Sequence, residues 1–74
     1  MTEFTERLAG EIRAEMARQG ISRRDLARLL GWSDTRTARR CSGRTRISAE
    51  DLDAIAHALG ITTDDLTSDP MRTT

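Results

Sequence analysis

Arginine is the residue type in this chain that is best suited to bind a charged ligand. All twelve basic residues are Arg, and eight of them fall within residues 21–46. Only Asp25 and Asp34 oppose these eight, so the segment has a net charge of +6, whereas residues 1–20 and 47–74 have net charges of −1 and −5. A guanidinium offers paired N–H donors that suit phosphate and the guanine edge. The segment is therefore expected to form an anion-binding surface; a solvated charged face is the alternative.

Catalytic and metal-ligating residues are few. Cys41 is the only Cys and His57 the only His, and no motif spacing links them to each other or to an acid. One Cys and one His with scattered carboxylates match no zinc spacing, and a lone Cys allows no internal disulfide. We therefore expect no enzymatic activity, no cofactor and no metal site. His57 is expected on a helix surface, paired with Asp53 one helical turn earlier.

Length and composition favour a single small soluble domain. The chain has 74 residues, of which 36% are hydrophobic and 32% charged. No apolar run approaches the roughly 20 residues of a membrane span, and the N-terminus does not have the pattern of a signal peptide. We expect a cytoplasmic, nucleoid-associated protein with no membrane partner.

Apolar residues recur at helical spacing, and the helix starts are marked repeatedly. Three segments read Ile-Ser/Thr-x-x-Asp-Leu, beginning at Ile21, Ile47 and Ile61. In each, the Ser or Thr can cap a helix N-terminus, and the Asp three residues later can reach back to the cap amide. Ser33 marks a fourth start. The pattern predicts an all-α, compact five-helix bundle within residues 1–67, followed by a flexible tail over 68–74. The predicted helices cover 3–19, 23–30, 34–42, 49–59 and 63–67.

The connection between the second and third predicted helices is only three residues long, Gly31-Trp32-Ser33. Two short helices joined so tightly must cross steeply, which is the geometry of a helix-turn-helix. The motif would cover about 23–42, with 34–42 as its second helix.

At this point the chain resembles the lambdoid phage repressor and Cro-type (XRE-like) helix-turn-helix family, whose fold is that of the lambda-repressor DNA-binding domain. The matching features are Leu26-Ala27 four residues before Leu30-Gly31, Ser42-Gly43 closing the third helix, and the run from Ala56 to Ile61. The chain departs from the family at Thr37 and Arg40, where aliphatic residues are usual. It also has Met16 and Cys41 where the family often has an Arg–Glu pair, so an apolar contact is expected there instead. Thr37, Ala38 and Cys41 would form the core side of the third helix, with Trp32 sealing the turn.

The resemblance implies that helix 34–42 enters the major groove of double-stranded DNA. Asp34, Thr35 and Arg39 would then face base edges, with Arg36 close by; Asp34 could instead only stabilise its helix dipole. Arg40 would contact phosphate or lie on the surface. The positions implied to hold phosphate are Ser22, Arg23, Ser33, Arg40, Arg44 and Arg46.

One module reads few base pairs, so we expect a homodimer, at least on DNA, that binds an inverted-repeat operator. Ile61, Leu66 and Met71 could form the dimer contact, although Ile61 and Leu66 could instead belong to the core. The small size favours a phage or mobile-element repressor or Cro-like switch protein, with no small-molecule ligand expected. Two alternatives stay open. One is an antitoxin or anti-repressor module that mainly binds a protein, and the other is an excisionase-like architectural DNA protein.

Overall fold

The computed structural model of the chain describes residues 3–67, and all the regular secondary structure within them is helical. The helices are α1 (Glu3–Gln19), α2 (Arg23–Leu30), α3 (Asp34–Ser42), α4 (Ala49–Leu59) and α5 (Thr63–Thr67). These bounds confirm the five predicted helices and the all-α fold class. The predicted tail, and with it Met71, lies outside the described residues.

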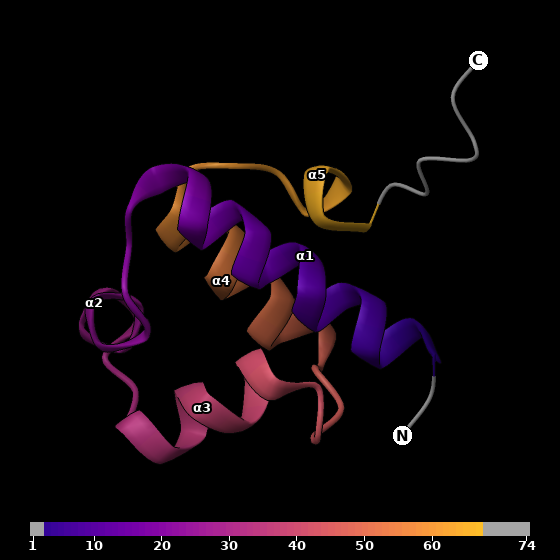
Figure 1. Cartoon of the computed structure of the whole chain (residues 1–74), viewed down its shortest axis with the longest axis horizontal. Coiled ribbons are helices and arrows are strands. Elements are labelled where there is room, and N and C mark those ends of the chain that lie inside the picture. The colour runs from indigo at the N-terminus through magenta and orange to yellow at the C-terminus, as the bar shows by residue number, and fades with distance from the viewer. Residues whose placement is uncertain (1–2, 68–74) are drawn as a thin grey trace.

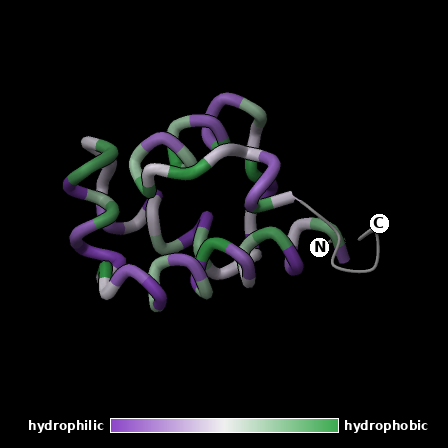
Figure 2. The backbone as a smooth tube through the Cα atoms, turned by 90° about the horizontal axis from the view of Figure 1, so that it is seen from above, coloured by the Kyte–Doolittle hydropathy of each residue, from purple (hydrophilic) through white to green (hydrophobic). Residues whose placement is uncertain are grey.

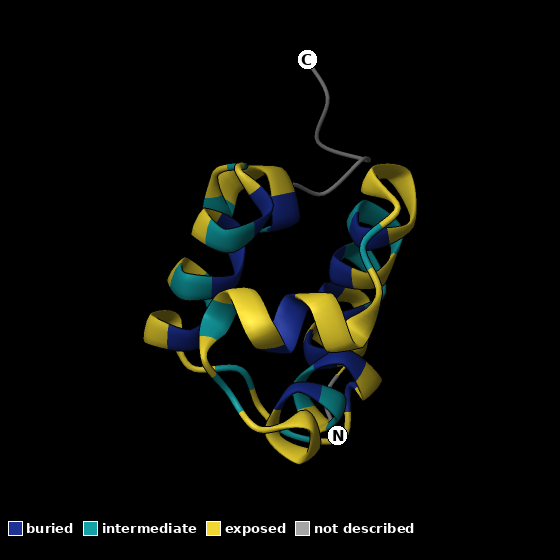
Figure 3. Cartoon of the chain, turned by 90° about the vertical axis from the view of Figure 1, so that its left-hand side faces the viewer, coloured by how far each residue is buried: buried dark blue, intermediate teal, exposed yellow. Residues whose placement is uncertain are grey.

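The helices form a small bundle around one core. Helix α1 runs diagonally across the molecule and packs on α3 below it, α2 closes one end against α3 and α4, α4 lies behind, and α5 packs on α1 and α4 (Figure 1). Hydrophilic and hydrophobic stretches are mixed along the chain (Figure 2), and the buried residues lie on the inward sides of the helices (Figure 3). The core is formed by Leu8, Ile12 and Met16 of α1, Leu26 of α2, Cys41 of α3, Ile55, Ala56 and Leu59 of α4, and Leu66 of α5.

The sequence signals for helix starts act as predicted at two of the three repeated segments. Ser22 accepts from the amide of Asp25 at 3.0 Å, and the Asp25 carboxylate accepts from the amide of Ser22 at 3.1 Å. Thr62 and Asp65 form the same reciprocal pair at 3.2 and 2.9 Å. At the third segment, Ser48 caps α4 by accepting from the amide of Asp51 at 3.1 Å. The predicted return bond from Asp51 is wrong, because that carboxylate binds α3 instead.

The inward side of α3 is nearly as expected. Thr37 is 0% exposed and Cys41 is 5% exposed. Ala38 is half-buried, and Trp32 packs against the core from the turn. The hydroxyl of Thr37 donates to the Ser33 carbonyl at 2.9 Å, so this polar group is buried with its hydrogen bond made within the helix.

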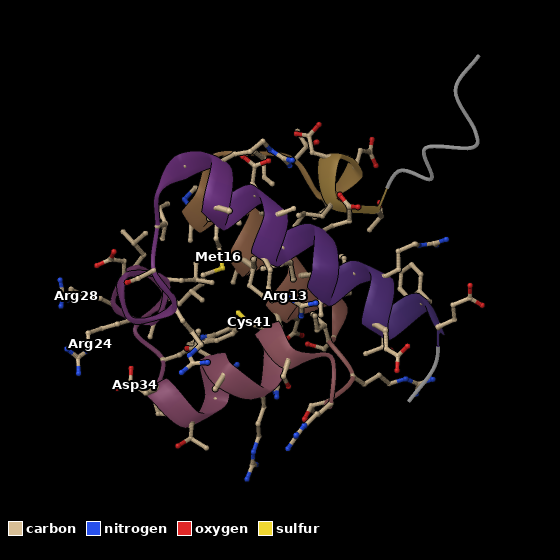
Figure 4. All side chains as sticks on the ribbon, viewed as in Figure 1. Arg13, Met16, Arg24, Arg28, Asp34 and Cys41 are labelled. Carbon is tan, nitrogen blue, oxygen red and sulfur yellow. The ribbon has the colours of Figure 1, made fainter. Side chains whose placement is uncertain are left out.

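The apolar contact expected at Met16 and Cys41 is present. Met16 and Cys41 belong to one hydrophobic cluster, and in Figure 4 both lie between α1 and α3. Arg13, one helical turn before Met16, reaches the same region and donates from Nη1 to the carbonyl of Cys41. A cation therefore still meets the C-terminal end of α3, where carbonyl oxygens lack helical partners.

Ile61 and Leu66, two of the three residues considered for a dimer contact, belong to the core region. Leu66 is 2% exposed, and Ile61 is half-buried against the same cluster. Their alternative assignment to the core is thus the one that the fold supports. Within residues 3–67, none of the helices combines the length and the apolar character needed to cross a bilayer.

Candidate nucleic-acid interface

Helices α2 and α3 are joined by a turn whose backbone bonds leave little freedom. Gly31 adopts the left-handed conformation, with φ 72° and ψ 25°, which Gly reaches without steric cost. The amide of Trp32 donates to the Ala27 carbonyl at 3.0 Å, which closes α2 with a Schellman-type cap. Two residues after Gly31, Ser33 accepts from the amide of Arg36 at 3.1 Å and starts α3. Consecutive end and start signals therefore set the steep crossing of the two helices.

Three of the four residues predicted to read bases lie free on the outer surface of α3. Asp34, Thr35 and Arg39 are exposed, and within residues 3–67 their side chains form no hydrogen bond or ion pair. Asp34 stands at the first turn of α3 (Figure 4). An unpaired guanidinium beside a short hydroxyl and a carboxylate offers donors and acceptors of the kinds that base edges match.

The fourth predicted base reader, Arg36, is held by its own protein. Its guanidinium carbon lies 4.0 Å from the centroid of the Trp32 ring, and its Nη2 lies 2.8 Å from Oδ1 of Asp51. Stacking on Trp and pairing with a carboxylate both restrain the side chain. Its side chain nevertheless remains 45% exposed, so its outer edge is accessible.

Arg40 is held in the same way. Its Nε donates to the other oxygen of Asp51 at 2.9 Å, and its side chain is only 20% exposed. Arg36 and Arg40 are one helical turn apart on α3, and Asp51 belongs to α4, so the carboxylate ties the two helices together. We call Asp51 with these two arginines the Asp51 clamp. Burial raises the pKa of the Asp51 carboxyl, but hydrogen bonds from Arg40 and Arg36 lower that pKa by more, so it lies below its ordinary value.

The remaining predicted phosphate-binding residues stand at helix starts and in the loop after α3. Arg23 begins α2, and Arg44 and Arg46 lie in the loop to α4; all three are exposed and form no ion pair within residues 3–67. The hydroxyls of Ser22 and Ser33 are already engaged as N-caps. Any anion at these two helix starts would therefore meet backbone amides rather than free hydroxyls.

The sequence analysis gave no site role to two groups of residues, Asp51 and the pair Arg24 and Arg28. The position of Asp51 in a repeated cap segment predicted a bond to the Ser48 amide, whereas its carboxylate pairs with Arg36 and Arg40. Arg24 and Arg28 extend from α2 to the outside (Figure 4), where Arg28 lies only 4.0 Å from Asp25. Their exposure follows from the apolar spacing of α2, which leaves them opposite Leu26.

The lone Cys and His are separated in the fold. Cys41 is buried, and burial raises the pKa of its thiol even though Arg23 and Arg13 act in the opposite direction. His57 is exposed on α4 and does not form the expected pair with Asp53. No three His, Cys, Asp or Glu side chains gather within residues 3–67 in a way that could hold a metal ion.

The fold and this surface define a helix-turn-helix module. Residues 7–68 match the family described as "Helix-turn-helix domain", and the chain belongs to that family. No curated protein sequence matches the chain significantly.

Two solved structures are similar to it over nearly all of its length. The clp gene regulator ClgR from C. glutamicum has 29% sequence identity and a TM-score of 0.82, with 89% of this chain and 86% of that chain covered. A hypothetical transcription factor, NHTF from Neisseria, has 26% identity and a TM-score of 0.84, with 93% and 79% covered. Both neighbours are described as regulators of transcription.

Proposed function

We propose that this protein is a sequence-specific DNA-binding regulator of transcription that presents α3 to the major groove. The observation that carries the proposal is the unpaired outer surface of α3, formed by Asp34, Thr35 and Arg39, on a helix whose orientation is set by a three-residue turn. The family and the two neighbouring regulators support the same function.

Within this proposal, Arg39 is the principal base reader. A bidentate Arg–guanine contact is worth about 1–3 kcal/mol of discrimination between bases. Thr35 would contact a thymine methyl group, and Asp34 would accept from cytosine or stabilise the helix dipole. Arg36 would reach DNA only with the edge that the clamp leaves exposed.

The phosphate contacts come from elements on either side of α3. Arg23 and the amides at the starts of α2 and α3, next to Ser22 and Ser33, would hold one stretch of backbone. Arg44 and Arg46 would hold another. These contacts supply affinity and register, while the base contacts supply sequence preference.

A homodimer on an inverted repeat, with half-sites about 34–36 Å apart, would extend the number of base pairs read. Occupation of such an operator across a promoter would block polymerase, so repression of the Cro type is the proposed outcome. A phage or mobile-element origin is proposed from the sequence; the two solved neighbours are a C. glutamicum and a Neisseria protein.

Fluorescence anisotropy with a selected DNA sequence and a scrambled duplex, each at two salt concentrations, tests the proposal. We expect the wild-type protein to prefer the selected site by about 10³-fold or more and to lose affinity steeply with salt. Arg39→Ala should remove mainly the preference. The matched control is Arg7→Ala, which removes the same charge from an exposed residue of α1.

Equal and weak binding to both duplexes, with no effect of Arg39→Ala, would refute the regulator function while leaving the fold intact. The protein-binding alternative would then become the leading one, through the exposed acids of α4 and α5. A strong but unselective affinity would instead favour the architectural alternative.

A further inference from the structure

A cavity of about 460 Å³ lies beside α3, opening between α1, the start of α2 and the C-terminal half of α3. Its volume is within the range of about 300–1,000 Å³ typical of small-molecule sites. The apolar part of its wall comes from α1, the α1–α2 connection and α3. The residues of that part are Met16, Ala17, Ile21, Ala38 and Cys41.

The polar part of the cavity is cationic. Arg13 from α1 and Arg23 from α2 both line it, Ser42 adds a hydroxyl, and no acidic residue lines it. Arg13 is anchored there because its Nη1 donates to the Cys41 carbonyl. Arg23 has no ion-pair partner within residues 3–67. Two guanidiniums from different helices beside an apolar wall suit a molecule that has one anionic group and a flat apolar body.

We propose that this cavity binds a small amphipathic carboxylate, with its carboxylate between Arg13 and Arg23 and its apolar body against Met16, Ile21 and Ala38. This departs from our sequence-based expectation that the protein has no small-molecule ligand. The regulatory consequence rests on the proposed function. A ligand that engages Arg23 withdraws a phosphate contact and places a negative charge next to α3, so the ligand weakens DNA binding.

The binding step is tested without DNA, with 2-naphthoate as the probe. Its uncharged counterpart, 2-naphthalenemethanol, has the same ring system and is the matched control. Calorimetric titration should give an affinity for 2-naphthoate at least about tenfold higher, because the difference measures the charged contact. Amide chemical shifts in a ¹H–¹⁵N spectrum should move at Ala17, Ile21 and Ala38.

Two variants test whether the probe binds in this cavity. Arg13→Met keeps the approximate length of the side chain but removes the charge. It should lower the affinity for 2-naphthoate at least about fivefold and have little effect on the affinity for 2-naphthalenemethanol. Ala17→Met adds a side chain at an exposed position of the cavity wall and should weaken both compounds. Arg7→Met, on the same helix but away from the cavity, should change neither. The ¹H–¹⁵N spectrum of each free variant verifies that it is folded.

The same compounds then test the effect on DNA. Saturating 2-naphthoate should weaken binding of wild-type protein to the selected site by about fivefold or more at constant ionic strength. A concentration that just saturates the wild-type protein should have a smaller effect on Ala17→Met, whose DNA affinity without the compound should equal that of the wild-type protein.

The outcomes separate the site from its consequence and from the proposed function. Equal affinity for the two compounds, no effect of Arg13→Met, or shifts confined to other residues would overturn the site. Localised binding without any change in DNA affinity would overturn the regulation and retain the site. Localised binding to a protein that has no affinity for DNA would refute the proposed function, and the regulation with it.

Discussion

Replacement of Asp51 by Asn tests whether the Asp51 clamp, which links α3 to α4, stabilises the folded protein. The carboxylate accepts from Arg36 at 2.8 Å and from Arg40 at 2.9 Å, and its side chain is only 11% exposed. Asn keeps the shape and one acceptor oxygen but removes the charge. The two guanidiniums, which lie one helical turn apart on the same side of α3, would then have no carboxylate between them.

The cost follows from the burial of each partner. A hydrogen bond to a charged group contributes about 1.5–3 kcal/mol to stability, and removing one partner of a fully buried pair costs about 3–5 kcal/mol. Arg36 is 45% exposed, so its bond must be discounted for solvent screening. We therefore expect Asp51→Asn to lower the free energy of unfolding by about 2 kcal/mol. For a domain of this size, about 2 kcal/mol corresponds to a fall in Tm of about 8–16 °C.

Thermal and urea denaturation followed by circular dichroism measure this loss. The matched control is Asp53→Asn, which makes the same change on the same helix at an exposed residue with no ion pair within residues 3–67. A double-mutant cycle with Arg40→Gln should give a coupling energy of about 1 kcal/mol or more. If Asp51→Asn is no more destabilising than Asp53→Asn, or the coupling is near zero, the reasoning about the clamp is refuted.

The clamp also has a defined pH dependence. The pKa of Asp51 is lower in the folded protein than the unfolded value of about 3.9. Its contribution is therefore fully present above that unfolded pKa and is lost as the pH falls through the folded pKa. The stability difference between wild type and Asp51→Asn should be constant near neutral pH and shrink below about pH 4.

Four further substitutions test the caps, the backbone and the loop. Ser22→Ala should lower the free energy of unfolding by about 1 kcal/mol, because the α2 N-cap bond is lost; an unchanged urea midpoint would contradict this. Gly10→Ala should raise the same quantity by about 0.5–1 kcal/mol, since Gly10 lies within α1 and a Cβ there would meet only Arg13 Nη2 at 3.8 Å. Gly31→Ala should lower it by about 1–2 kcal/mol, because φ is +72°, although beyond Gly31 and its chain neighbours no atom lies within 4 Å of the added Cβ. Equal effects of the two Gly substitutions on Tm would show that backbone conformation is not the cause. Arg46→Ala should lower the affinity for selected and scrambled DNA equally and reduce the slope of log affinity against log salt by about 1. A loss of affinity confined to the selected site would assign Arg46 to base reading instead.

Local signals were sufficient for the secondary structure of this chain. The cap at Ser22 and the αL glycine at Gly31 act within a few residues of themselves, so their effect can be predicted without knowing the rest of the fold. Spacing along one helix also predicted the core side of α3, whereas Phe4 of α1 and Leu29 of α2 are 50% and 59% exposed despite their helical spacing. The three-residue turn follows from the same local signals, and with it the helix-turn-helix.

The candidate site could be predicted only in part. The exposure of Asp34, Thr35 and Arg39 could be predicted without tertiary information, because helical spacing puts them away from the core side of α3. The roles of Arg36 and Arg40 could not be read in this way, because their partner Asp51 lies 15 and 11 residues further along the chain. The Ser48–Asp51 spacing matches that of Ser22–Asp25, so sequence alone assigned the same capping box to both.

The sequence by itself determined the helices, the turn and the basic segment, because caps, turn residues and charge density depend on neighbours along the chain. The tertiary structure decided which of the arginines remain available. In the folded protein the Asp51 carboxylate of α4 pairs with Arg36 and Arg40 of α3, whereas Arg23 and Arg39 have no partner within residues 3–67. The tertiary structure also brings Arg13 of α1 and Arg23 of α2 to the same cavity. Such pairings depend on distances between elements, which the order of residues does not specify until the core has packed.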